Sequence, residues 1–261
     1  MATGKSLQPE SAIASWQHWH GDLPGKPEVV GQLNGGRSNR SYLLKSGKQK
    51  MVLRLKGNDT LLPGSNRRSE VNIWQAASSA GLAPPLLYAN EQQGVLVSAY
   101  IEDRLPSQPE ANRSIVEHAF MLLKRCHQLD VDAHSLDLAE HIHQYWQLIE
   151  AMHSPVDPAL LEQRQSMRDL LESPRFRTAR TGLCHHDPIV ANFVGSPDRL
   201  YLVDWEYAAR GLLVMDYAAL AVEWSVDDEL VTALSGMDPE LLIMAKALYK
   251  YMCRLWEEVL L

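Results

Sequence analysis

The residues whose types and spacing could do chemistry lie in one stretch of the second half of the chain. His185, Asp187 and Asn192 stand in the spacing H-x-D-x-x-x-x-N. Asp204 follows twelve residues after the asparagine. Phosphoryl transfer needs a carboxylate that positions the acceptor hydroxyl and receives its proton, and oxygen ligands that hold Mg²⁺. The pattern therefore predicts Asp187 as the catalytic carboxylate and Asn192 and Asp204 as metal ligands.

Short apolar runs separated by turn residues predict a β meander before this stretch. Three such runs cover residues 29–33, 41–44 and 51–55. Residues 67–80 have helical residue types and stop at Gly81, and a further strand is expected over residues 95–101. The first part of the chain is therefore expected to form a small sheet.

Beyond Pro109 the sequence favours helices, because apolar residues recur at three- and four-residue spacings. The expected helices cover residues 114–129, 136–152, 158–171 and 239–260. One short β hairpin, over residues 193–203, interrupts them. The sequence predicts an α+β fold of two lobes, with an N-lobe at residues 1–105 and a larger, mainly helical C-lobe at residues 106–261.

Two motifs of the C-lobe resemble those of a known family. The H-x-D-x-x-x-x-N loop is one, and the D-W-E-Y-A segment from Asp204 to Ala208 is the other. Over residues 29–224 the chain resembles the aminoglycoside phosphotransferase and choline kinase superfamily, and most of all its choline kinase and thiamine kinase-like branch. This resemblance implies a protein-kinase-like fold with a small antiparallel N-lobe sheet. It also implies ATP as phosphoryl donor and Mg²⁺ as cofactor.

The resemblance extends to the part of the N-lobe that would hold the nucleotide. A loop of small residues lets backbone N–H groups approach phosphate, and it contains Gly35, Gly36, Ser38 and Asn39. Arg54 stands where the family places a cation that supplies charge to the phosphates. Glu70, early in the following helix, is the expected partner that holds Arg54.

Further candidates surround the catalytic stretch. The resemblance implies that His185 orders its own loop and that Asp216 bonds the loop backbone, so both are predicted as structural support. Glu206, Glu223 and Trp224 are predicted to contact the acceptor, although Trp224 can equally pack in the core. Residues 185–229 hold nine carboxylates and two cations. Such an acidic face, with aromatic rings nearby, suits a cationic acceptor.

These features predict an ATP- and Mg²⁺-dependent kinase that acts on a small cationic alcohol such as choline, thiamine or ethanolamine. An aminoglycoside, or another antibiotic or sugar, is the alternative acceptor. A catalytically silent kinase-like binding protein is an alternative of another class, which the presence of Asp187, Asn192 and Asp204 disfavours. A metal-dependent hydrolase would need further ligands, and His141 and His143 point to different faces of a helix.

Composition and charge limit the other possibilities. The 261 residues are 46% hydrophobic and 22% charged, which indicates a globular protein. Because 25 basic residues face 32 acidic ones, the net charge is −7, which argues against a broad nucleic-acid surface. No apolar run is long enough to span a membrane, no secretory signal is visible, and the three cysteines form no framework. We expect a cytoplasmic protein whose partner is a small-molecule substrate.

Overall fold

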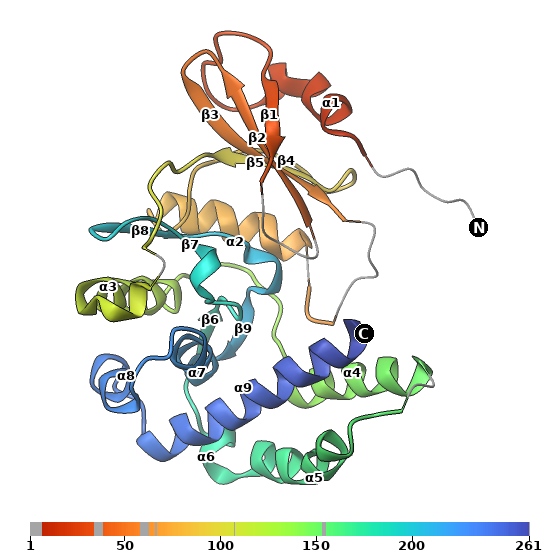
Figure 1. Ribbon diagram of the computed structural model, residues 1–261, viewed down its shortest axis with the longest axis vertical. Coiled ribbons are helices and arrows are strands. Elements are labelled where there is room, and N and C mark those ends of the chain that lie inside the picture. Colours follow the sequence, from red (N-terminus) through yellow and green to blue (C-terminus); the bar gives the residue numbers. More distant parts are fainter. Residues whose placement is uncertain are drawn as a thin grey trace.

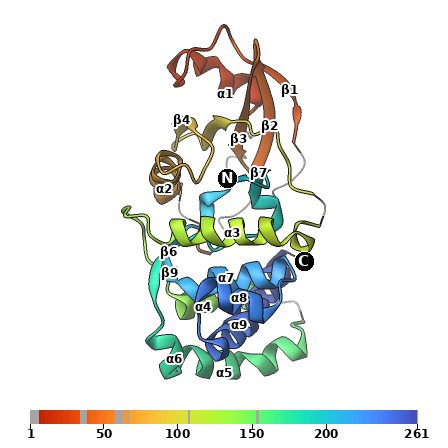
Figure 2. The ribbon, with the colours of Figure 1, turned by 90° about the vertical axis from the view of Figure 1, so that its left-hand side faces the viewer.

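The computed structural model describes residues 7–33, 39–57, 63–65, 67–106, 108–152 and 155–260. An antiparallel sheet lies at one end of the molecule and most of the helices lie at the other (Figure 1). Turned by 90°, the molecule shows the same two parts stacked along its long axis (Figure 2). This arrangement agrees with the two-lobed α+β fold expected from the sequence, whereas the exact boundary at residues 105 and 106 stays a prediction.

The sheet contains five strands in the order β1-β2-β3-β5-β4, and all neighbours are antiparallel. Its members are β1 (Glu28–Gln32), β2 (Asn39–Ser46), β3 (Gln49–Lys56), β4 (Leu86–Asn90) and β5 (Val95–Ala99). Arg54 on β3 pairs with Ser41 on one side and with Leu96 on the other. Arg54 is therefore fixed by the central strand, which gives its side chain a rigid origin.

Three helical segments accompany the sheet, namely α1 (Pro9–Ala12), the short 3₁₀ helix η1 (Ile13–His18) and α2 (Arg67–Ser79). Ala12, Ile13 and Trp19 pack on a small apolar cluster with strand residues such as Leu53 and Val97. Helix α2 carries Glu70 and packs against β4 and the C-lobe turn η4 (Trp205–Tyr207). It therefore connects the sheet to the catalytic stretch.

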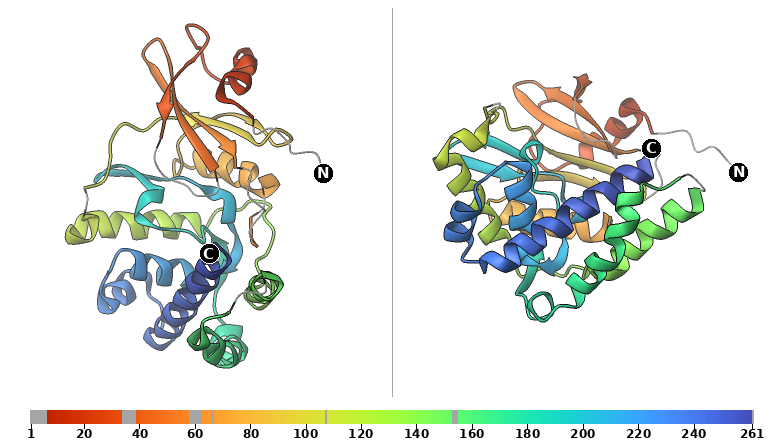
Figure 3. Two further views of the ribbon diagram at one scale, coloured as in Figure 1. Left: turned by 45° about the vertical axis from the view of Figure 1, so that its right-hand side comes forward. Right: turned by 60° about the horizontal axis from the view of Figure 1, so that its bottom comes forward.

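The C-lobe is built on a larger apolar core. Its helices are η2 (Pro109–Ala111), α3 (Arg113–Cys126), α4 (Leu138–Met152), α5 (Pro158–Glu172), α6 (Pro174–Arg177), α7 (Leu213–Glu223), α8 (Asp228–Ser235) and α9 (Pro239–Leu260). Helix α7 lies at the centre, and α9 packs along α7, α4 and α5 (Figure 3). The long helix α9 thus closes one side of the lobe.

Two short antiparallel pairs position the catalytic stretch. Strand β6 (Thr181–Cys184) pairs with β9 (Ala209–Leu212), and it ends immediately before His185. Strand β7 (Phe193–Ser196) follows the turn η3 (Val190–Asn192) and pairs with β8 (Arg199–Leu202). Because β8 ends two residues before Asp204, the hairpin returns this carboxylate to the place from which the chain left at Asn192.

Several elements differ from the sequence-based expectation. The helix expected over 114–129 ends three residues earlier, and the one expected over 136–152 starts two residues later. Helix α7 was not predicted, since it is apolar on nearly all sides and lacks an amphipathic period. No helix within the described ranges is long and apolar enough to cross a membrane.

Candidate active site

The backbone of the catalytic loop is fixed by Asp216, a fully buried residue of α7. Its carboxylate accepts hydrogen bonds of 2.8 Å from the backbone N–H groups of His185 and His186. It also accepts one of 2.9 Å from Nε2 of His127, at the end of α3. Burial alone would disfavour the charge, but His127 and the loop N–H groups outweigh it and lower the pKa of Asp216 to about 2. The ionised carboxylate of Asp216 therefore anchors the catalytic loop.

His185 connects this loop to the segment that carries Asp204. Its imidazole is fully buried, Nε2 lies 3.1 Å from the carbonyl oxygen of Val203, and its ring meets that of Trp205 at a steep angle. These contacts support the structural role predicted for His185, and the backbone bonds above support the role predicted for Asp216.

Two residues of the site adopt a left-handed backbone, His186 with φ +64° and Asp204 with φ +65°. Such a conformation is uncommon for residues other than glycine, and it persists only where the surroundings hold it. The imidazole of His186 lies against Gly211, where a Cβ would come within 2.6 Å of Cε1. Burial lowers the pKa of His186 to about 4, so this ring is neutral at pH 7.

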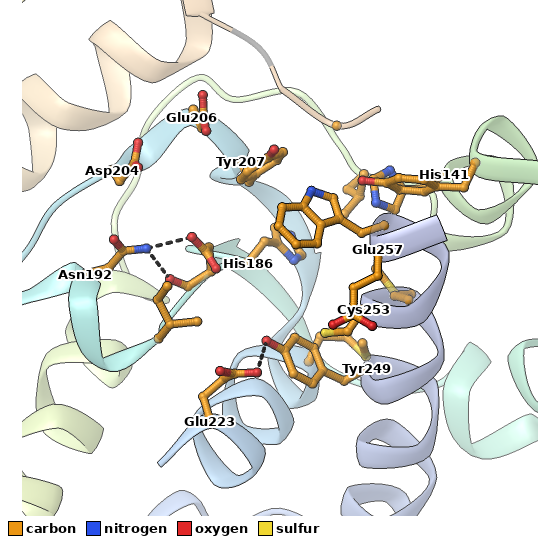
Figure 4. A pocket seen from close by; sticks show the side chains of 18 of the residues that line it. His141, His186, Asn192, Asp204, Glu206, Tyr207, Glu223, Tyr249, Cys253 and Glu257 are labelled. Carbon is orange, nitrogen blue, oxygen red and sulfur yellow. Dashed lines mark hydrogen bonds between the residues drawn. The ribbon is translucent and has the colours of Figure 1, made fainter. Parts of the chain in front are cut away.

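Asp187 and Asn192 are held together at the turn η3. Nδ2 of Asn192 donates to the Asp187 carboxylate at 2.7 Å and to its carbonyl oxygen at 2.9 Å (Figure 4). Burial, together with the charge of Asp204, raises the pKa of the Asp187 carboxyl. A raised pKa makes Asp187 a stronger base than a carboxylate in water.

Arg54 links the lobes electrostatically. Its guanidinium is hydrogen-bonded to Glu70 on α2 and to Asp204 in the C-lobe. Arg54 and Glu70 are both buried, with exposed fractions of 8% and 1%. Burial opposes the charge of Arg54, but the carboxylates of Glu70, Asp204 and Glu206 outweigh it and raise the Arg54 pKa. The structure thus brings together the cation and the partner that the sequence indicated.

Glu206 lies beside this group. It is 8% exposed, and it accepts a hydrogen bond of 3.0 Å from Nδ2 of Asn39 on β2. Burial and the charge of Asp204 raise the pKa of Glu206 to about 7. Asn39 is therefore near the predicted metal ligands. The other residues predicted for the nucleotide loop, Gly35, Gly36 and Ser38, lie outside the described residues.

A cavity of about 520 Å³ opens beside Asp187, between the catalytic loop, α4 and α9. Five carboxylates line it, namely Asp187, Asp204, Glu206, Glu223 and Glu257. Four aromatic side chains also line it, namely Tyr145, Tyr207, Tyr249 and Trp256. The hydroxyl of Tyr249 donates to the carboxylate of Glu223 at 2.9 Å (Figure 4). The predicted acceptor residues Glu206 and Glu223 thus border one cavity, which we name the acceptor cavity.

A second cavity, of about 400 Å³, lies between the sheet and the C-lobe. Arg54, Trp74 and residues 98–101, at the end of β5 and just beyond it, line it. Asn192 and Asp204 border both cavities. Two small molecules bound in the two cavities would therefore meet at these predicted metal ligands, as transfer of a group between them requires.

The structure places Trp224 in the core, which is one of the two positions expected for it. Trp224 is only 1% exposed, its Nε1 donates to the carbonyl oxygen of Pro188 at 3.1 Å, and its ring meets Phe193 edge to face. Its indole packs under the catalytic loop because Trp224 caps α7 on the side of the core. The aromatic residues that do line the cavity were missed, although Tyr249 and Trp256 lie seven residues apart on the predicted helix 239–260, a spacing that places them on one face.

We expect Trp224→Ala to lower the free energy of unfolding by about 3–5 kcal/mol, because truncation of a buried tryptophan leaves a large void. The KM for the acceptor should stay at the wild-type value in the enzyme that remains folded. Urea unfolding and steady-state kinetics check both parts, with Trp224→Phe as the milder control. An acceptor KM that rises while the free energy of unfolding is unchanged would show that Trp224 contacts the acceptor.

The residues present fit the Mg²⁺ and ATP that the resemblance implies. Asp204 and Asn192 supply oxygen atoms, which are the ligands that Mg²⁺ prefers. Arg54 supplies a fixed cation next to them, as the phosphates of a nucleotide require. Asn192 and Asp204 would hold the metal ion, and Arg54 would face the phosphates.

Asp204→Asn tests this metal assignment. A neutral amide replaces an anionic ligand, so half-maximal activity should need a higher Mg²⁺ concentration, and excess Mg²⁺ should recover part of the rate. The rate is measured as a function of Mg²⁺ at constant free ATP, with Asp198→Asn in the exposed β7–β8 turn as control. Superimposable Mg²⁺ curves for Asp204→Asn and the wild type would contradict the assignment.

Comparison with solved structures identifies the fold of this chain. Choline kinase LicA from Streptococcus pneumoniae matches with a TM-score of 0.71 and 22% sequence identity, over 88% of this chain and 86% of its own. At this level of identity the likeness concerns the fold. The fold is therefore the two-lobed, protein-kinase-like one, as the sequence predicted.

The profile of the phosphotransferase enzyme family matches residues 29–242, and the chain belongs to this family. Protein LicA from Haemophilus influenzae is 26% identical over 204 residues, which are 75% of this chain and 58% of that protein. Mouse acyl-CoA dehydrogenase family member 10 is 25% identical over 206 residues, 71% of this chain and 19% of that protein. The chain thus spans less than two thirds of both relatives, and the family indicated by its motifs is confirmed.

Proposed function

We propose that this protein is an ATP- and Mg²⁺-dependent kinase that transfers the γ-phosphoryl group to the hydroxyl of a small cationic alcohol. The observation that carries this proposal is the composition of the acceptor cavity. Five acidic side chains line it, of which Asp204 is ion-paired with Arg54, and no lysine or arginine occurs among its described lining residues. A cation is the ligand that such a site stabilises best.

The aromatic lining supports the same class of acceptor. Trp256 and Tyr249 come from α9, and Tyr145 comes from α4, so the rings line the cavity from two helices. The face of an aromatic ring attracts a cation, by up to about 2 kcal/mol when the pair is desolvated. Glu223 adds a full negative charge, and its hydrogen bond from Tyr249 fixes the carboxylate in one place.

The chain's own residues account for the proposed reaction. Asp187 would accept the proton of the acceptor hydroxyl, and Asn192 holds the Asp187 carboxylate in one orientation. Arg54, held by Glu70, would bind the phosphates of the nucleotide. Bound Mg²⁺ supplies neutralisation of the phosphate charge. The acceptor cavity then presents the hydroxyl to the base, which is the positioning that phosphoryl transfer depends on.

The second cavity suits the nucleotide. It is lined by apolar residues such as Val52 and Leu96 and by residues 98–101. A mostly apolar cavity with a few polar groups is a common setting for a planar ring with hydrogen-bonding edges. A nucleobase in this cavity would leave its phosphates next to Arg54 and Asp204.

A panel of alcohols with ADP formation as readout tests the proposal. The panel contains choline, ethanolamine, thiamine, homoserine and kanamycin. Choline is the first to test, because the matched structure from Streptococcus pneumoniae is that of a choline kinase. Asp187→Ala, assayed in parallel, measures the background of ATP hydrolysis. Turnover with one of the first three alcohols supports the proposal, and turnover with kanamycin alone would make the protein an antibiotic phosphotransferase.

Absence of turnover with every alcohol, while ATP still binds, would instead favour a catalytically silent kinase-like protein. Equilibrium binding of ATP in the presence and absence of Mg²⁺ distinguishes this outcome from an unfolded preparation. The complete catalytic set of Asp187, Asn192 and Asp204 makes us expect turnover.

A further inference from the structure

One wall of the acceptor cavity comes from the N-lobe. Gly64 lies between β3 and α2, and among the described lining residues it is the only one that precedes Leu136 in the chain. The elements on either side of Gly64 carry Arg54 and Glu70, which form the ion pair on the nucleotide side. At Gly64 the chain of the nucleotide-binding lobe therefore reaches the acceptor.

Gly64 lies directly on the imidazole of His141, a residue of α4. A Cβ on Gly64 would be 2.9 Å from Cε1 of His141, 3.3 Å from its Nδ1 and 3.7 Å from Cδ1 of Tyr207. The first of these distances is shorter than carbon atoms tolerate without displacement. Gly64 also has φ +89°, a backbone conformation that strains every other residue. Both the contact and the backbone thus require glycine here.

His141 is a rigid support rather than a side chain that can move aside. It is 8% exposed, and its ring packs edge to face on Tyr145, with the ring centres 5.0 Å apart. Its helix α4 packs against α9, which lines the same cavity. Nδ1 of His141 is buried and has no hydrogen-bond partner among the described residues. Because a Cβ on Gly64 would be 3.3 Å from this nitrogen, Gly64 lies beside this edge of the imidazole.

We propose that Gly64 is a specificity-determining residue: it closes the acceptor cavity against His141 and so limits the size of the alcohol that reaches Asp187. The inference rests on the proposed function, because it takes this cavity as the acceptor site. A side chain at position 64 either enters the cavity or pushes the N-lobe chain away from His141. Both effects change the binding of the acceptor and not that of the nucleotide, since Gly64 does not line the second cavity.

The first experiment compares Gly64→Ala with Gly236→Ala. Gly236 has φ +70°, so both variants strain the backbone, but a Cβ on Gly236 meets nothing within 4 Å. The acceptor is the alcohol of the panel with the highest kcat/KM. In Gly64→Ala its KM should rise about tenfold while the KM for ATP stays within about twofold, because displacement of a wall by an ångström affects only the ligand that touches it. Gly236→Ala should leave both values unchanged.

A double-mutant cycle shows whether the effect passes through His141. In the His141→Ala background the ring that meets the new Cβ is gone, so Gly64→Ala should then change the acceptor KM much less. His141→Ala by itself should raise kcat/KM for the larger alcohol thiamine relative to ethanolamine, which tests the closure even if Gly64→Ala does not fold. Equal effects of Gly64→Ala in both backgrounds, or unchanged selectivity in His141→Ala, would overturn the proposal.

A third measurement needs no substrate. Burial and the neighbouring His186 lower the pKa of His141 to about 4. If Gly64→Ala lifts the chain from the ring, water reaches Nδ1, and the NMR titration of the His141 Cε1–H proton should move toward the ordinary histidine pKa of about 6.5. Gly64→Ala leaves the other titratable groups on this side of the cavity unchanged, so they do not account for a shift between the variant and the wild type. These groups are Tyr145, His186, Tyr207, Cys253 and Glu257.

The measurements separate the two proposals. If the His141 titration shifts in Gly64→Ala but the wild type phosphorylates none of the alcohols, the contact of Gly64 with His141 is supported and the proposed function is overturned. If the wild type phosphorylates a cationic alcohol but Gly64→Ala changes neither the His141 titration nor the acceptor KM, the proposed function is supported and the role of Gly64 is overturned.

Discussion

Asp187→Ala is expected to lower kcat at least about a hundredfold, which is the scale of general acid–base catalysis by one positioned group. The Kd for ATP should remain near the wild-type value, because a base that acts in the transition state contributes little to ground-state binding. Single-turnover phosphorylation of the acceptor and equilibrium binding of ATP measure the two quantities. Because burial raises the pKa of Asp187, the variant removes a stronger base than an ordinary carboxylate.

The matched control for this variant is Asp198→Asn, which changes an exposed carboxylate of the β7–β8 turn outside both cavities. It should keep full activity. A rate for Asp187→Ala above about a third of the wild-type rate would exclude Asp187 as the base, because general bases contribute far more than threefold. Attention would then turn to Glu206, whose pKa of about 7 also suits proton transfer.

Asp216→Asn is expected to lower the free energy of unfolding strongly. An amide cannot accept every hydrogen bond that the carboxylate accepts from the loop and from His127, and its own N–H groups would face donors. Removal of one partner from such a buried charged group costs about 3–5 kcal/mol. For a chain of this size the loss lowers Tm by roughly 6–20 °C. Calorimetry with and without ATP measures it, and a Tm within about 2 °C of the wild type would contradict the anchoring role.

The pH dependence of stability, compared between the wild type and Asp216→Asn, gives an independent check. The pKa of Asp216 is about 2 in the folded protein and near 3.9 when the chain is unfolded, so the depressed value stabilises the fold above the unfolded pKa. This contribution is lost as the pH falls from about 4 to about 2. The stability difference between wild type and Asp216→Asn should therefore narrow below about pH 4. A difference that stays constant to pH 2.5 would mean that the carboxylate charge is not the stabilising element.

The parts of the site that depend on local spacing could be predicted from the sequence. Asp187 and Asn192 are five residues apart, and a hairpin of fixed length returns Asp204, so their convergence follows from the chain alone. Arg54 and Glu70 were paired through a resemblance, and a strand followed by a helix brings them together. The three-strand meander, the strand over residues 95–101 and the longer helices could be predicted from turn residues and apolar periodicity, whereas β4, α7 and α8 were not predicted.

The acceptor side could not be predicted in the same way. Trp224 and Trp256 are both tryptophans near helix ends, and the sequence does not tell which of them faces the core. That choice depends on how α9 packs against α7 and α4, contacts between residues far apart in the chain. The contact of Gly64 with His141 is of the same kind, since it joins two lobes across 77 positions. Side-chain direction at such sites is set by tertiary packing, which no local pattern encodes.

The position of α9 has a consequence for how readily this protein can acquire new substrates during evolution. Its inner face, including Leu248, Tyr251 and Leu255, is buried in the core, whereas Trp256 and Glu257 line the acceptor cavity and remain partly or fully exposed. Substitutions at an exposed position such as Glu257 usually change stability by less than about 0.5 kcal/mol, whereas Trp256 also packs against the core. Mutations there can therefore remodel the acceptor cavity while the catalytic loop, the second cavity and the fold stay intact. Substitutions on one face of α9 can therefore change which alcohol the cavity accepts, while the residues proposed for phosphoryl transfer are retained.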